Sequence, residues 1–187
     1  MPLDSRERAM TPISPESAVL AIVAASPGHR VQGKKRIHKT AFLCAWCDAP
    51  IGAHFAIRHF GVFSTEIADA LDVLSFFGDL ETQDEQVGPN QYFTTVYSLG
   101  KGAAHEAIPA ISRVARHLAR YSTPSLEVAS TVAYFMKQGW PEARAVAETA
   151  RIKPAISTPE RFDATRTLLK EIAGLRATPH GQRPAHP

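Results

Sequence analysis

The chain has 187 residues, of which 44% are hydrophobic and 21% charged. This is the composition of an ordinary globular protein with a substantial core, and it excludes a wholly disordered chain. No apolar run approaches the roughly 20 residues of a membrane-spanning helix, and residues 1–11 do not resemble a secretory signal. Two cysteines cannot build a disulfide framework, so we expect a cytoplasmic protein.

Charge is distributed unevenly along the chain. Residues 1–60 hold eight Lys and Arg against four Asp and Glu, and residues 91–187 hold thirteen against seven. Between them, residues 61–90 hold no base and seven acids. A block of one sign is either a solvated face that keeps the protein soluble or a surface for a partner. The seven acids are Glu66, Asp69, Asp72, Asp79, Glu81, Asp84 and Glu85.

A polar arm and two helices are predicted at the start of the chain. We expect residues 1–12 to be flexible. Ser14 as N-cap and Pro15 at the first helical position mark the first helix. Its expected buried residues are Val19, Leu20, Ile22 and Val23. The second helix is expected after Gly33, with a basic first half and an apolar second half that reaches Trp46.

A short strand, a third helix and a hairpin are predicted next. Alternation of apolar and other residues over 55–58 suits a strand. Ser64 is the expected N-cap of the third helix and Gly78 its end. The inward stripe of this helix is Ile67, Ala70, Leu71, Leu74 and Phe77. Residues 80–87 and 91–99 are predicted to pair around a Gly-Pro-Asn turn. One face of that hairpin carries Phe93, Thr95, Tyr97 and Leu99.

The second half of the chain, residues 102–174, is predicted to be helical. A central, largely apolar helix is expected over 126–138, and the last helix is expected to end at Gly174. The predicted starts or caps of the four helices are Pro109, Ser125, Trp140 and Ser157. The first of these helices has the inward residues Ile111, Val114, Ala115 and Leu118. Residues 175–187, with three prolines, are predicted to form a disordered tail.

These elements predict a mainly α fold with a small β-hairpin. Helix, helix, strand, helix and hairpin is an order typical of a winged helix-turn-helix domain, here over residues 13–101. Residues 102–174 are expected to form a C-terminal helical bundle packed on that domain.

Two short motifs carry a family resemblance. A glycine, a basic helix start and an apolar run occupy residues 33–43, and Phe-Gly-Val-Phe-Ser occupies residues 60–64. With the hairpin exit at 97–100 and the helix at 126–131, they resemble the bacterial YwgA-like proteins, related to the Panacea (SocA-like) antitoxin domains. The resemblance spans residues 15–173. Its motif residues are Gly33, Ile37, Lys39, Phe60, Gly61, Phe63 and Ser64.

The motifs depart from the family pattern at several positions. Phe60 and Phe63 stand where the family has tyrosines, Val62 where it has proline, and His38 where glutamine is usual. The part of the second motif that still matches the family is explained by a turn at Gly61 and an N-cap at Ser64. The resemblance implies a winged-helix fold and, for the antitoxin branch, binding to a partner protein. For the YwgA branch it implies no settled activity.

No catalytic residue, metal or cofactor is predicted. Cys44 and Cys47 form a Cys-x-x-Cys without a second pair, and only His54 and His59 would be left to complete a zinc site. The cysteines lie near a helix C-terminus, where the dipole does not favour thiolate, so buried structural thiols are expected, with a redox or metal role as the lesser alternative. His38 is expected to cap or to pack. The absence of nucleophile, phosphate-loop and dinucleotide motifs argues against an enzyme.

The outward face of the third helix decides between two functions. It holds no cation, and an acid beside a DNA phosphate is repelled. We therefore predict a non-enzymatic protein–protein interaction module, antitoxin-like or a phage-defence accessory protein, whose partner is basic, a toxin or a defence component. Phe76 is the expected apolar anchor, unless it packs under the hairpin. The predicted partner-binding residues are Glu66, Asp69, Asp72, Phe76, Glu81 and Asp84.

The alternative function is nucleic-acid binding through basic residues of the second and fourth helices. The same residues would equally suit the acidic block, either within the chain or across a homodimer. The candidate nucleic-acid-binding residues are Lys34, Lys35, Arg36, Lys39, Arg113, Arg116 and Arg120.

Overall fold

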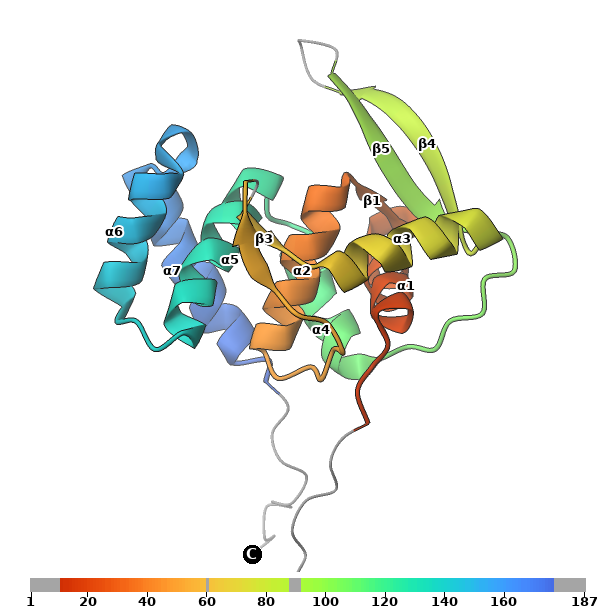
Figure 1. Cartoon of the computed structure of the whole chain (residues 1–187), viewed down its shortest axis with the longest axis horizontal. Helices are drawn as coiled ribbons and strands as arrows, with labels where there is room; N and C mark the ends of the chain where they lie inside the picture. Colours follow the sequence, from red (N-terminus) through yellow and green to blue (C-terminus); the bar gives the residue numbers. More distant parts are fainter. Residues whose placement is uncertain (1–10, 60, 88–91, 177–187) are drawn as a thin grey trace, which may run out of the picture.

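Helices make up most of the fold, and a small antiparallel sheet stands at one end (Figure 1). The computed structural model describes residues 11–59, 61–87 and 92–176. Among these residues, no helix combines the length and the apolar character needed to cross a bilayer. The elements are α1 (Pro15–Ala25), η1 (Pro27–His29), β1 (Arg30–Gln32), α2 (Lys34–Trp46), β2 (Ala56–Arg58), β3 (Gly61–Phe63), α3 (Thr65–Phe77), β4 (Leu80–Val87), β5 (Tyr92–Leu99), α4 (Pro109–Leu118), α5 (Thr123–Lys137), α6 (Glu142–Ile152), η2 (Pro154–Ile156) and α7 (Pro159–Ala173).

Side-chain caps start several of these helices, as local sequence predicted. The hydroxyls of Ser14 and Ser64 accept the N–H groups of residues 17 and 67, at 3.1 and 3.2 Å. Thr158 starts α7 in the same way. Each cap satisfies one of the N–H groups that a first helical turn leaves without a partner. The predicted starts of α1 and α3 are therefore confirmed, whereas α7, predicted to start at Ser157, is capped one residue later by Thr158.

The start of α5 differs from the prediction. Its N-cap is Ser122, whose hydroxyl accepts the N–H of Ser125 at 3.3 Å, and the helix begins at Thr123. Pro124 lies in the first turn, where its missing N–H costs no hydrogen bond. The prediction of Ser125 as the cap was wrong because two serines three residues apart offer the same signal.

The larger sheet has the strand order β1-β5-β4, and β2 and β3 form a separate antiparallel pair. The predicted hairpin is confirmed in β4 and β5, which pair from Leu80–Leu99 to Val87–Tyr92; its turn lies outside the described residues. β1 was not predicted, because three residues with a single buried side chain, Val31, are too short to show a period. This strand ties the base of the hairpin to the segment before α2.

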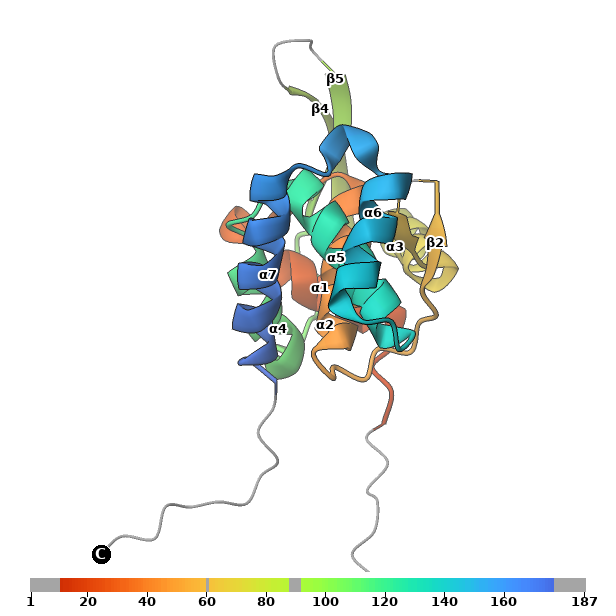
Figure 2. The same cartoon turned by 90° about the vertical axis from the view of Figure 1, so that its left-hand side faces the viewer.

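One hydrophobic core runs through both halves of the chain. It includes Val19, Phe42 and Leu71 from the first half and Leu126 and Ile172 from the second. α1 packs on α3 and α4, and α2 packs on α4 and α5. Figure 2 shows α5 with α6 on one side and α7 on the other, in agreement with their contacts. The predicted central position of α5 is confirmed.

The last turn of α3 extends beyond this core. Phe77, predicted to face inward, is 72% exposed. The helix ends at Gly78, whose left-handed φ of 79° turns the chain into β4. The four preceding apolar residues of the stripe, from Ile67 to Leu74, are buried. Only the first three turns of the helix therefore lie over the core, and the periodicity of the sequence does not show where the core ends.

The passage from α3 into the hairpin depends on a close backbone approach at Gly100. Its N–H donates to the carbonyl of Asp79 at 2.9 Å, and a Cβ at this position would lie 1.9 Å from the carbonyl oxygen of Gly78. We predict that Gly100→Ala lowers the free energy of unfolding by about 1–3 kcal/mol, the range for overpacking. Urea denaturation measures the change.

Gly52→Ala is the matched control for this substitution. A Cβ at position 52 would meet its nearest atom, the carbonyl oxygen of Ile13, at 3.4 Å, an ordinary contact. The control is expected to keep the stability of the parent protein within about 0.5 kcal/mol. Equal stabilities of the two variants would contradict the proposed clash.

Candidate functional site

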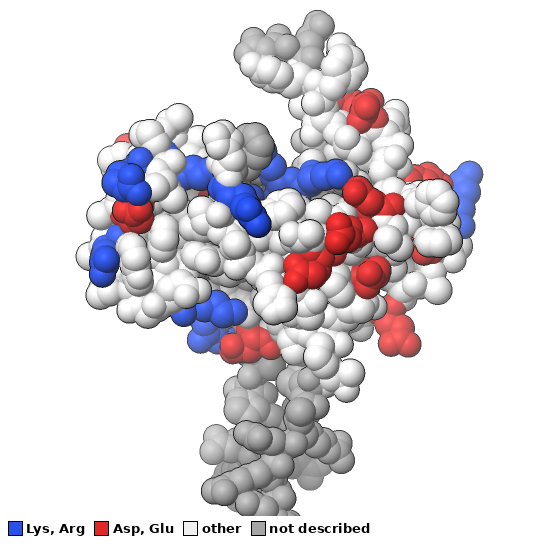
Figure 3. Space-filling model, in the orientation of Figure 1, with Lys and Arg blue, Asp and Glu red and all other residues white. Residues whose placement is uncertain are grey.

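The candidate site is the outward surface of α3 together with the β4–β5 hairpin. Ser64 sets the start of α3, and its inward side chains, among them Ile67 and Leu71, are completely buried. This burial fixes the opposite side of the helix toward solvent. Asp69 and Asp72 lie on that exposed side. Figure 3 shows acidic side chains gathered over α3.

Part of the acidic block is paired within the chain. Asp72 accepts from Lys34 at 3.1 Å, and Glu85 pairs with Arg30. These pairs join the hairpin and α3 to the segment around β1. Pairing of basic residues with the acidic block within the chain was one of the predicted alternatives. Both members of the Lys34–Asp72 pair are largely exposed, so the pair contributes at most about 1 kcal/mol.

Other acids of the block remain open to a partner. Asp69 and Glu81 are exposed, and neither side chain has a hydrogen bond or ion pair with a described residue. Asp84 accepts from the hydroxyl of Thr95 at 2.8 Å across the hairpin and stays exposed. The acidic surface is therefore only partly neutralised.

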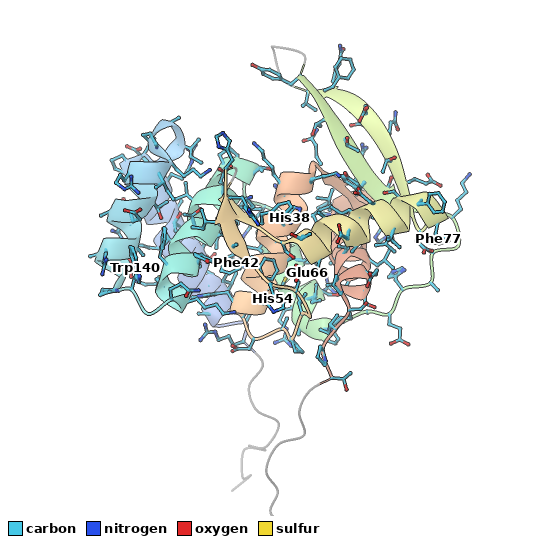
Figure 4. The ribbon with its side chains drawn as sticks, viewed as in Figure 1. His38, Phe42, His54, Glu66, Phe77 and Trp140 are labelled. Carbon is cyan, nitrogen blue, oxygen red and sulfur yellow. The ribbon has the colours of Figure 1, made fainter. Side chains whose placement is uncertain are left out.

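Glu66, a predicted partner-binding residue, is engaged at the start of α3. Its carboxylate accepts from the ring Nδ1 of His54 and from the hydroxyl of Ser64, each at 2.8 Å (Figure 4). Hydrogen bonding to its own backbone N–H, and then to His54 and Ser64, lowers the pKa of Glu66 to about 2. A carboxylate in the first helical turn also suits the positive end of the helix. Glu66 thus holds the segment around His54 against the start of α3.

Large apolar side chains are exposed on the same surface. Phe76 is 84% exposed, so it does not pack under the hairpin, and its ring meets that of Phe77 edge-on at 5.2 Å. Figure 4 shows Phe77 at the far end of α3. Among the described residues, the large hydrophobic side chains that are at least 45% exposed all belong to α3 or β5. They are Val73, Phe76, Phe77, Tyr92 and Phe93.

Sequence reasoning singled out Phe76 from this group but not the others. Phe77 fell within the inward stripe, and Phe93 was assigned to one hairpin face. The signal that was available is the glycine directly after Phe77, which ends the helix there. β1 pairs only with the base of the hairpin, at residues 96–98 of β5. Tyr92 and Phe93 lie at the other end of β5, beyond the reach of β1, and are therefore exposed.

The predicted nucleic-acid-binding residues of α2 divide between surface and interior. Lys34 and Lys35 are exposed. Arg36 is half-buried and donates to the carbonyls of Leu118 and Ala119 at 3.1 and 3.0 Å. Two of the four α2 cations, Arg36 and Lys39, therefore point into the protein, because the first turns of α2 already lie against neighbouring elements.

The predicted basic residues of α4 and of the segment directly after it are on the surface. Arg113, Arg116 and Arg120 are exposed. Arg120 donates to Glu171 at 3.0 Å, and the ring of His117 lies 2.9 Å from the same carboxylate. His117 and Arg120 thus hold the C-terminal end of α4 against α7.

The cysteines are buried, as predicted. Cys44 lies within α2 and Cys47 directly follows it. Burial raises the pKa of both thiols, that of Cys47 to about 12. Both are therefore protonated thiols at neutral pH. In the described part of the chain, no three side chains of the metal-binding types come together.

His38 and Lys39 join the two sequence motifs at residues 33–43 and 60–64. The ring Nδ1 of His38 accepts the N–H of Ser64 at 3.3 Å, and the ring stacks on Phe63 with centroids 4.5 Å apart. Lys39, buried, donates to the carbonyl of Val62 at 2.8 Å. Burial first, then the charges of Lys39 and Lys34, lowers the pKa of His38 to about 4. The packing role predicted for His38 is thus present.

The depressed pKa of His38 makes stability depend on pH. The ordinary pKa of 6.5 applies in the unfolded chain, so below pH 6.5 the unfolded state binds a proton that the folded state refuses until about pH 4. We predict that the free energy of unfolding falls between pH 6.5 and 4, by on the order of 3 kcal/mol in total. Urea denaturation across this range measures the slope.

His38→Gln removes the titrating group and keeps an acceptor for the Ser64 N–H. This variant is expected to show a flatter dependence on pH, whereas His105→Gln, a change at an exposed histidine, should keep the parent slope. Identical slopes for the parent and His38→Gln would rule out the neutral buried imidazole.

Comparisons with family models, curated proteins and solved structures find no match for this chain. The resemblance to the YwgA-like and Panacea families therefore stays a prediction. Of its motif residues, Phe60 lies outside the described residues. The two motifs are in direct contact through the Lys39–Val62 and His38–Ser64 hydrogen bonds.

Proposed function

We propose that residues 13–101 form a winged helix-turn-helix unit that binds a protein partner, and that the chain is a non-enzymatic interaction module. The order α1, β1, α2, β2, β3, α3, β4, β5 supports this topology, with β1 paired to β5 and the short β2–β3 pair inserted between α2 and α3. In such a unit α3 takes the place of the recognition helix and the β4–β5 hairpin that of the wing. These are the elements that carry the acids and the exposed aromatic side chains.

The charge of α3 favours protein over DNA as the ligand. Recognition helices meet phosphates along the groove and read bases mainly with Arg, Lys, Asn or Gln. The exposed side of α3 instead presents Asp69 and Asp72, and β4 adds Glu81. Each acid near a phosphate raises the free energy of a complex. A partner with Lys and Arg around its contact surface would be attracted to the same face.

The observation that carries the proposal is the exposure of Phe76 and Phe77. Soluble proteins seldom leave neighbouring aromatic side chains open to water unless the surface has a use. Aromatic anchors with a polar surround are typical of binding hot spots. We infer a partner that offers an apolar pocket flanked by basic residues. The family resemblance agrees with such a partner, a toxin or a defence component.

A photoreactive phenylalanine analogue at position 76 tests this assignment in cells that express the chain. We expect it to form a crosslink to one protein, because the 76 side chain would lie in the contact. The same analogue at position 144, an exposed position on α6, is the control and should not crosslink to that protein. Equal crosslinking from both positions would refute the assignment of the contact to α3.

Binding to the crosslinked protein is then measured by calorimetry with two double variants. Phe76→Ser with Phe77→Ser removes the anchors, and Asp69→Lys with Glu81→Lys reverses the charge. Each is expected to weaken binding by at least about 30-fold, the effect of a lost hot spot of about 2 kcal/mol. Glu106→Lys, a charge reversal at an exposed acid on the loop before α4, should leave the affinity unchanged. Parent-like binding by both double variants would exclude this surface.

The purified chain is expected to be a monomer. A two-fold symmetric contact through α3 would place Asp69 and Asp72 against their own copies, and like charges in an interface oppose association. Light scattering at low ionic strength measures the mass. A dimer that Phe76→Ser with Phe77→Ser converts to a monomer would show that a second copy, and not a basic partner, covers the patch.

A further inference from the structure

A basic groove lies between the first half of α2 and the β2–β3 pair. Its volume is about 460 Å³, within the range of small-molecule sites. No acid is found among its described lining residues. Figure 3 shows a row of Lys and Arg side chains on this part of the surface, beside the acids of α3. Apart from Phe63, the lining is formed by Lys34, Lys35, His38, Lys39, Arg58 and His59.

We propose that this groove, called here the α2 groove, binds a nucleotide, with its phosphate near Lys35 and Arg58 and its base against Phe63. The groove is separate from the exposed aromatic side chains of α3, so the proposal does not depend on the proposed function. Four cations and an aromatic wall in one groove match a ligand that combines an anion with a planar, apolar body.

The cations of the groove differ in their surroundings. Lys34 pairs with Asp72 at its outer edge. Arg58 is exposed and has no ion pair or hydrogen bond with a described residue. Lys39 lies at the floor, where burial lowers its pKa to about 8. An anion in the groove would favour the charged form of this lysine.

The start of α2 adds donors to the same place. α2 has 13 residues and begins after Gly33 without a side-chain cap. The N–H groups of its first turn, at Lys34 and Lys35, therefore have no capping side chain, and the positive end of the helix lies beside the groove. Helix starts of this kind receive phosphate oxygens.

His38 supplies an independent sign that an acceptor is missing. It is 2% exposed, and its ring Nε2 is buried without a hydrogen-bond partner among the described residues. Because its Nδ1 accepts the N–H of Ser64, the ring proton belongs on Nε2, which is a donor. Buried donors are nearly always satisfied. A ligand oxygen at the floor of the groove would satisfy this one once binding moves aside the side chains that cover the Nε2 atom.

The surroundings favour a single nucleotide over a nucleic-acid strand. Phe63 stacks on His38 and forms a planar wall against which one base would pack. Asp72 and Asp69 stand on α3 beside the groove. A longer polyanion leaving the groove on this side would meet these carboxylates, whereas a small ligand would not.

Calorimetric titration of the full chain with AMP, ATP, inorganic phosphate and a DNA duplex at low salt tests the proposal. We expect one nucleotide to bind per chain, more tightly than inorganic phosphate because the base adds contact with Phe63. No nucleotide binding, or a duplex that binds more tightly than both nucleotides, would overturn the nucleotide site.

Lys35→Ala with Arg58→Ala is the decisive variant, since both side chains are exposed and the fold should persist. It is expected to lower nucleotide affinity at least tenfold. Arg113→Ala with Arg116→Ala removes the same charge from exposed residues of α4 and should bind as the parent does. Equal losses in the two variants would show that general charge, and not the groove, attracts the nucleotide.

The NMR resonance of the His38 ring Nε2–H reports contact at the groove itself, and a change in the net charge of the protein does not shift it. Nucleotide at saturation is expected to shift the resonance of the His38 Nε2–H, since that proton gains an acceptor. Phe76→Ser with Phe77→Ser should leave this shift unchanged. An unshifted His38 signal with bound nucleotide would place the ligand elsewhere.

Discussion

Two buried polar contacts of α2 position β3 and the start of α3. Lys39 donates to the Val62 carbonyl, and His38 accepts the Ser64 N–H. Both groups lie in the core, where an unsatisfied polar group would raise the free energy of the folded state. The contacts therefore hold β3 and the start of α3 in one place against α2. They set the direction in which α3 leaves the core.

The two proposed binding surfaces follow from that direction. One side of α3 is buried, so Asp69, Asp72 and the terminal phenylalanines face solvent. On the other side of the same contacts, the β2–β3 pair stands next to the basic start of α2 and encloses the groove. The Lys34–Asp72 pair lies where the acidic and the basic surface meet. A basic protein and an anionic small molecule would thus bind side by side and would not compete for the same charges.

Elements with a local signal were predicted well, and those without one were not. Ser14, Ser64 and Thr158 act through residues within three positions along the chain, so their caps are visible in sequence. β1 exists because Val31 pairs with Tyr97, a partner far along the chain. Phe77 was misplaced because helical periodicity gives the side of a helix and not the length of it that the core covers.

The amino-acid sequence by itself determined the helices, the hairpin and the separation of acidic from basic segments, because caps, periodicity and charge depend on neighbours in the chain. Tertiary structure decided which charges act together. Arg36 donates to the carbonyls of Leu118 and Ala119 at the end of α4, while Arg58 and His59 lie with Lys34 and Lys35 around one groove. Residues more than 20 positions apart meet only when the core has formed, so no local pattern records their contact.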